Sequence, residues 1–140
     1  MTTTDSTTRS PTRSATQTQV AQAEALVKAQ QFPAALQILH QCLTLQPTDR
    51  QSLYLKAVCH RYLQDVSQAI ATINTLLATY PEYARGYQEL GHCYRIQTKF
   101  PEAISAYQMA VQLHPGLLAS WQQLSHLFSV LNEPKLVQEA

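Results

Sequence analysis

The chain has 140 residues, which is enough for one domain with a buried core. Ten Lys and Arg residues against nine Asp and Glu leave a net charge of +1, so bulk charge does not favour nucleic acid as a partner. Only three glycines occur, too scattered for a loop that wraps a phosphate, and no run of about 18 apolar residues could span a membrane. We therefore expect one soluble domain that binds neither nucleic acid nor membrane.

The first fifteen residues are mostly Thr and Ser and offer almost nothing to bury. Ordering them would cost conformational entropy without a return in burial. We therefore expect a disordered tail over 1–15 and a folded region over 16–140.

The remaining sequence predicts helices and no strand, because its apolar residues recur at helical spacing. Phe32-Pro33 and Phe100-Pro101 favour helix starts, since the missing N–H of proline has no helical partner in the first turn. The predicted helices are 17–30, 33–45, 50–63, 66–79, 84–97, 100–113, 118–131 and 134–140.

These helices form pairs that repeat at a fixed interval. Pro47, Pro81 and Pro115 are evenly spaced (81 − 47 and 115 − 81), and each follows an apolar helical stretch. We predict repeats over 16–49, 50–83 and 84–117, and a partial fourth repeat over 118–140. The fourth begins with Trp121, Leu124 and Phe128, which lie one repeat after Tyr87, Leu90 and Tyr94.

The repeat over 84–117 carries the fullest pattern. Its first helix has an aromatic-x-x-Leu-Gly-x-x-Tyr pattern, formed by Tyr87, Leu90, Gly91 and Tyr94, and its second helix has Ala103, Tyr107 and Ala110 before Pro115. This pattern, with its period of about 34 residues, resembles the tetratricopeptide repeat (TPR) family. The resemblance implies an all-α fold, a right-handed superhelical solenoid of about 3.5 helix-turn-helix repeats. It also implies a scaffold that binds another protein or peptide.

In that family the first helices line a concave groove, and the second, fifth, ninth and twelfth positions of each repeat face into it. The resemblance therefore implies a peptide-binding groove in this chain lined by Tyr54, Val58, Arg61, Arg85, Gln88, His92, Arg95, Gln122 and His126. Arginine holds carboxylates through paired hydrogen bonds, so we expect a peptide with acidic groups or a free C-terminal carboxylate. The alternative is that these arginines are ordinary solvated surface.

One well-known groove of the family is the carboxylate clamp that grips chaperone tails, which needs Lys, Asn and Arg at five positions. This chain has Val20, Glu24, Leu55, Arg85 and Glu89 there. Only Arg85 is compatible, and Glu24 and Glu89 would repel the ligand carboxylates. We therefore do not expect chaperone tails to bind in that way.

The pairs Cys59-His60 and His92-Cys93 contain the usual zinc donors. Equal repeat positions place Cys59 and Cys93 on neighbouring helices about 8 to 10 Å apart, with the histidines on different faces. We therefore expect no metal and no cofactor. Three cysteines without a C-x-x-C pair favour a reducing cytoplasm, and no catalytic motif indicates an enzyme.

The fourth repeat stops early in its second helix, which leaves two further interpretations. An exposed apolar end would make the chain a self-associating structural module and thus a homo-oligomer. Alternatively, the chain is the N-terminal regulatory or substrate-orienting arm of a larger enzyme. The stretches LYLKAVCHRYL, GYQELGHCYR and SWQQL resemble the arms of bacterial sulfotransferases that contain these repeats.

Overall fold

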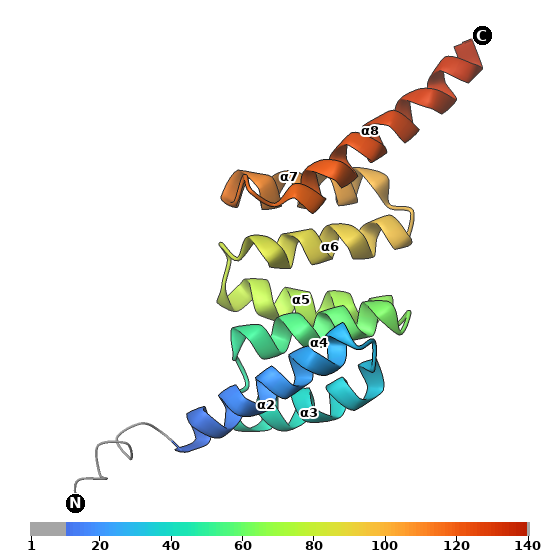
Figure 1. Ribbon diagram of the computed structural model, residues 1–140. Helices are drawn as coiled ribbons and strands as arrows, with labels where there is room; N and C mark the ends of the chain where they lie inside the picture. The colour runs from blue at the N-terminus through green and yellow to red at the C-terminus, as the bar shows by residue number, and fades with distance from the viewer. Residues whose placement is uncertain (1–10, 140) are drawn as a thin grey trace, which may run out of the picture. The chain divides into compact units, whose positions relative to one another are not determined.

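The computed structural model describes the backbone of residues 11–139 and the side chains of residues 16–131. Within residues 11–139 it contains seven helices and no strand, so the predicted all-α fold is confirmed (Figure 1). The helices are α2 (Pro11–Lys28), α3 (Phe32–Leu45), α4 (Arg50–Tyr62), α5 (Val66–Thr79), α6 (Ala84–Ile96), α7 (Phe100–Leu113) and α8 (Leu118–Glu139). From α3 to α7, every bound lies within one residue of its prediction.

The first helix starts earlier than predicted. We expected a tail over 1–15, but α2 begins at Pro11, so residues 11–15 are helical and that part of the expectation is wrong. Proline suits the first turn of a helix, and a helix that has formed gains one backbone hydrogen bond for each added residue. Residues 1–10 lie outside the described range.

The last helix is also longer than predicted. In place of separate helices over 118–131 and 134–140, the chain forms one helix, α8, without a break (Figure 1). The three hairpin turns each contain a residue at positive φ, Gln30 (62°), Gln64 (66°) and Thr98 (59°), at the same position of successive repeats. A non-glycine residue at positive φ costs free energy, and the packing of the hairpin's second helix must offset that cost. At 132, the next position in this series, the chain stays helical because the backbone gains more by continuing the helix than by turning.

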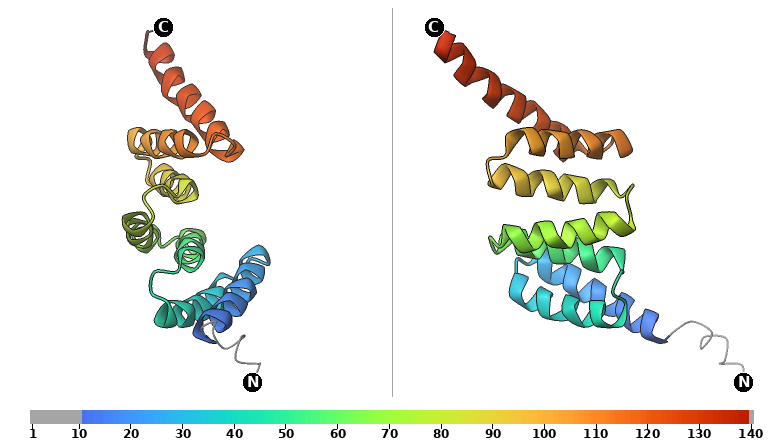
Figure 2. Two further views of the ribbon diagram at one scale, coloured as in Figure 1. Left: turned by 90° about the vertical axis from the view of Figure 1, so that its left-hand side faces the viewer. Right: turned by 180° about the vertical axis from the view of Figure 1, so that it is seen from behind.

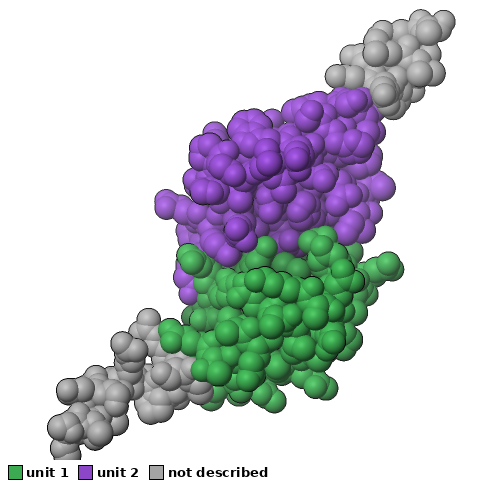
Figure 3. Space-filling view, in the orientation of Figure 1, with its two compact units in different colours: residues 1–79 green, residues 80–140 purple. Residues whose placement is uncertain are grey.

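Where we expected one domain, the chain divides into two compact units between residues 79 and 80, and the described parts of these units are residues 11–79 and 80–139 (Figure 3). The physical reason is that a helical hairpin packs mainly on its neighbours in sequence, so few contacts join distant parts of the chain.

The first unit contains α2 to α5, which pack side by side in chain order (Figure 2). Its core holds small and branched side chains from the first three of these helices: Ala23, Ala35, Leu39, Leu55 and Cys59. Helix α4 begins after Asp49, whose carboxylate accepts a hydrogen bond from the backbone N–H of Ser52 at 3.0 Å. This cap fixes the start of the helix that carries three of the predicted groove residues.

The second unit contains α6, α7 and α8, with α7 packed against both of the others through cores that include Ala103, Tyr107, Val111, Leu124 and Leu127. Repeat equivalence is visible in its hydrogen bonds. Tyr87 Oη donates to the carbonyl of Pro81 at 2.9 Å, and Trp121 Nε1 donates to the carbonyl of Pro115 at 2.8 Å. The two donors lie one repeat apart, and so do the two acceptors. An aromatic side chain in the first turn of α6 and of α8 therefore makes the equivalent hydrogen bond to the preceding loop.

Candidate binding surfaces

Four predicted groove residues form one stripe along α6. Arg85, Gln88, His92 and Arg95 follow one another at intervals of three or four residues, which places them on one face of a helix. Arg85 is exposed and the other three are half-buried. The stripe thus presents two cations with polar side chains between them.

Gln88 connects this stripe to α8. Its Oε1 accepts a hydrogen bond from the hydroxyl of Ser120 at 2.8 Å, and Ser120 is fully buried. Gln122 and His126, which we predicted to line the same groove, lie exposed on α8. The hydrogen bond therefore fixes the helix that carries them relative to the stripe.

His92 is held by a buried tyrosine. Its Nδ1 lies 2.6 Å from Tyr107 Oη, and the two rings meet edge to face with centroids 5.4 Å apart. Tyr107 is fully buried in α7. This pairing restricts the imidazole of His92 to one orientation.

Arg95 carries a donor that the fold does not use. Its Nε is buried and makes no hydrogen bond to any residue that the structure describes. A buried N–H without an acceptor costs roughly 1 to 3 kcal/mol, so this position of the Arg95 side chain reduces the stability of the unit.

The predicted residues in the first unit lie on α4. Tyr54 packs partly against the core, and Val58 is 7% exposed, so little of its side chain reaches the surface. Arg61 lies with its Cζ 4.5 Å above the ring of Tyr62, and Tyr62 stacks on Phe32 with ring centroids 4.8 Å apart. The guanidinium of Arg61 is therefore supported by a cation–π contact.

Two positions of the family's carboxylate clamp are buried. Leu55 is 4% exposed and Glu89 is 3% exposed, so neither side chain offers a surface to a ligand. Our expectation that Glu89 would meet ligand carboxylates at the surface is therefore wrong, because that side chain is buried. The clamp remains incomplete, since Val20 and Leu55 have no polar group to replace those it requires.

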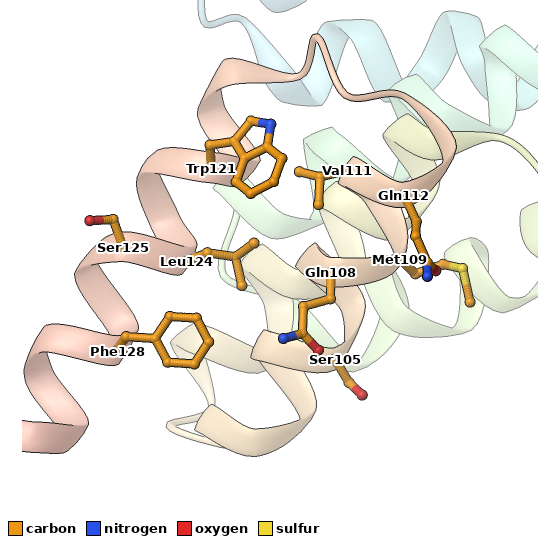
Figure 4. Close-up of a pocket in the computed structure, with 9 residues that line it drawn as sticks. All are labelled: Ser105, Gln108, Met109, Val111, Gln112, Trp121, Leu124, Ser125 and Phe128. Atoms are coloured by element: carbon orange, nitrogen blue, oxygen red, sulfur yellow. The ribbon is translucent and has the colours of Figure 1, made fainter.

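The sequence reasoning missed an apolar groove between α7 and α8 (Figure 4). Its volume is about 680 Å³, and its walls include Met109 and Val111 from α7 and Trp121, Leu124 and Phe128 from α8. Trp121 and Phe128 are 48% and 45% exposed. The spacing of the apolar residues along α8 was the signal that could have revealed it.

The cysteines are buried free thiols. Burial raises the pKa of Cys59 to about 11, and it also raises the pKa of Cys42. Within the described part of the chain, no three His, Cys, Asp or Glu side chains gather closely enough to hold a metal ion. None of the helices described has the length and apolar character needed to cross a membrane.

Two family models match the chain. The model of subunit 3 of the anaphase-promoting complex (cyclosome) matches residues 7–76, and a tetratricopeptide repeat model matches residues 60–117. The chain belongs to the tetratricopeptide repeat family. The family predicted from the repeat period is thus confirmed, whereas a comparison with curated proteins gives no match.

Solved structures of other proteins share this fold. The first TPR of Spaghetti (RPAP3), bound to the HSP90 peptide SRMEEVD, has a TM-score of 0.78 at 16% identity, over 84% of this chain and 94% of that one. The Sgt2 TPR domain from Aspergillus fumigatus has a TM-score of 0.80 at 15% identity, over 86% and 82%. MamA from Desulfovibrio magneticus RS-1 has a TM-score of 0.74 at 22% identity, over 89% and 70%. The TPR fold is therefore common to all four chains.

Proposed function

We propose that this TPR chain is a non-catalytic protein-interaction module that binds an acidic peptide along the α6 stripe. Arg85 and Arg95 are the anchors. The observation that carries the proposal is that both lie on one face of α6, with Arg85 exposed and Arg95 half-buried. Arginine suits this task because its planar guanidinium binds a carboxylate through two parallel hydrogen bonds.

The spacing of the anchors indicates what such a peptide contains. Arg85 and Arg95 are ten residues apart, which corresponds to about 15 Å along a helix. An extended peptide covers that distance in roughly four to five residues. The ligand then carries two acidic groups at this separation, one of which is a side chain and the other a side chain or the C-terminal carboxylate.

The polar residues near the two arginines also contact the ligand in this proposal. His92 is fixed by Tyr107 and Gln88 by Ser120, so both present polar atoms without a large loss of side-chain entropy on binding. Gln122 and His126 extend the polar surface onto α8. They would contact the part of the ligand that lies beyond the two arginines.

The first unit offers a second polar position for a partner. We propose that Tyr54 and Arg61 contact the same class of ligand, with Arg61 supported by the ring of Tyr62. Val58, which is buried, would contribute by packing beneath them.

The likeness to the RPAP3 domain supports a peptide ligand, since that domain is bound to the acidic HSP90 peptide SRMEEVD. The clamp positions of this chain differ from the required Lys and Asn residues, so we propose the α6 arginines as its carboxylate site. The three free thiols support a cytoplasmic location, where cysteines stay reduced.

Charge reversal in the full chain tests this proposal. We expect Arg85→Glu and Arg95→Glu each to weaken the binding of fluorescent acidic peptides by at least about tenfold, the loss typical of an anchor residue. Lys99→Glu is the matched control, because Lys99 is exposed in the same unit, lies outside the stripe and undergoes the same change of charge. Equal affinities for the three variants would contradict the proposal.

We also propose that the chain self-associates through its fourth repeat. Four large apolar side chains of α8 are exposed: Leu118 (66%), Trp121 (48%), Phe128 (45%) and Leu131 (41%). Apolar residues gathered in this way favour an interface. A mass that stays at the 15.7 kDa of one chain at high concentration in light scattering would contradict it.

A further inference from the structure

We infer that the groove between α7 and α8 receives α8 of a second copy of this chain, with the two α8 helices antiparallel. This inference rests on the proposed self-association and specifies its surface, its occupant and its orientation.

The groove requires a neutral, apolar occupant. Trp121, Leu124 and Phe128 point from α8 toward α7, where Val111 faces them (Figure 4). None of the residues that line the groove is charged. A charged ligand would therefore lose its hydration there without meeting a side chain of opposite charge.

The repeat register shows what kind of element fits. Val111, Trp121 and Leu124 lie two repeats after Leu43, Leu53 and Lys56, because the difference in position is the same for each pair (111 − 43, 121 − 53 and 124 − 56). In the first unit, those three earlier residues line a hollow together with Pro47 and with four side chains of α5: Gln68, Ala71, Thr72 and Thr75.

Helix α5 follows α4 after a short turn, so it runs antiparallel to α4. By equivalence, the surface formed by α7 and α8 fits a helix antiparallel to α8.

A second α8 has the pattern that this surface needs. Its apolar residues lie at alternating intervals of four and three, the spacing of a coiled-coil seam, and they are Leu117, Trp121, Leu124, Phe128 and Leu131. Leu117 and Leu124 already pack within their own unit, so the exposed Trp121, Phe128 and Leu131 are the side chains offered to a second copy. His126 is the one titratable residue between Leu118 and Leu131, so no pair of like charges opposes the contact.

Two-fold symmetry then makes the contact reciprocal. A two-fold axis perpendicular to α8 places the second α8 antiparallel to the first, and the same residues of each copy cover those of the other. Trp121 and Phe128, exposed in the single chain, become buried in both copies at once. A single type of contact thus fills two grooves.

The mass of the full chain tests the surface. We expect light scattering to show a dimer, with twice the 15.7 kDa mass of one chain, and Phe128→Glu to raise its dissociation constant by at least about tenfold. Ser129→Glu is the matched control on the adjacent exposed position of α8 and should leave the dimer intact. Circular dichroism of both variants checks that the helices are retained.

Cysteine cross-linking tests the orientation without removing an aromatic residue of the seam. Gln112 lies toward the Trp121 end of the groove, and Ser105 lies toward the Phe128 end (Figure 4). They are seven residues apart on α7, about 10 Å, while a disulfide needs Cα atoms within about 7 Å. Mixed with Leu131→Cys under mild oxidation, Gln112→Cys should form the cross-linked heterodimer and Ser105→Cys should not.

Each result has a definite meaning. Preferential cross-linking of Ser105→Cys would overturn the antiparallel orientation. A dimer that Phe128→Glu leaves unchanged would overturn the α8 contact but leave self-association standing, whereas a monomer at every concentration would overturn both. The native cysteines are buried, so the parent chain serves as the unlinked control.

Discussion

Tyr107 of α7 lies directly against Gly91 of α6, so closely that a Cβ atom on Gly91 would be 2.7 Å from Cε1 of the tyrosine ring. The two helices pack face to face only because this position has no side chain. The same ring holds His92 through its hydroxyl, so one buried residue positions both the backbone and a predicted binding residue.

Gly91→Ala should destabilise the chain. Overpacking against Tyr107 costs about 1 to 3 kcal/mol, which exceeds the gain of up to about 1 kcal/mol from replacing glycine by alanine in a helix. Urea unfolding measures the difference. Gly116→Ala is the control, because its new Cβ would meet nothing closer than His114 Nε2 at 3.4 Å. If both variants unfold at the same urea concentration, the close approach is unimportant for stability.

Tyr107→Phe should lower the free energy of unfolding by about 1 kcal/mol, because it removes the hydroxyl bonded to His92 and keeps the ring. A double-mutant cycle with His92→Ala separates this hydrogen bond from other effects. We expect the double variant to lose less stability than the sum of the two single variants. Simple additivity would indicate that the two side chains do not interact.

Asp49→Ala should cost about 1 kcal/mol, the usual value of a helix N-cap. The carboxylate of Asp49 accepts hydrogen bonds from Ser52 N at 3.0 Å and Ser52 Oγ at 2.7 Å. Asp65→Ala is the comparison at the start of α5, where the bond to Gln68 N is 3.4 Å long, and it should cost less. Urea unfolding at pH 8 is suitable, since burial lowers the pKa of the nearby His60 and keeps that ring neutral. A larger loss from Asp65→Ala would reverse the expected order.

Cys59 should make stability fall as the solution becomes alkaline. Burial raises its pKa to about 11, above the ordinary value of 9.0. Between these two values the unfolded chain has lost the thiol proton and the folded chain has kept it. The stabilisation is therefore complete below about pH 9 and is lost as pH rises toward 11, by on the order of 2 kcal/mol. Thermal unfolding at several pH values measures it, and Cys59→Ala should show a smaller decline than the parent chain.

Much of the fold could be predicted because the relevant information is local. The even spacing of Pro47, Pro81 and Pro115, together with the helical spacing of the apolar residues, predicts five helices within one residue of their observed bounds. Helix periodicity and turn position depend on residues that are close in sequence, so a single chain is enough to reveal them. The prediction was wrong at both ends, where α2 starts at Pro11 and α8 continues past residue 131.

The candidate site could be predicted only in outline. Position within the repeat selected Val58 and His92 in the same way, yet Val58 is buried and His92 is tied to Tyr107. It also treated Glu89 as a surface charge, whereas the fold buries it. Nothing in the repeat pattern shows which of these side chains is buried and which reaches the surface.

The sequence by itself determined that this chain is a set of helical hairpins and which side chains occupy equivalent positions. Only the tertiary structure decided which of those side chains reach the surface, that Arg95 has an unused donor, and that Trp121 and Phe128 line an open groove. The physical reason is that exposure and hydrogen bonding depend on what the neighbouring helices place against a residue, and those helices lie far away along the chain.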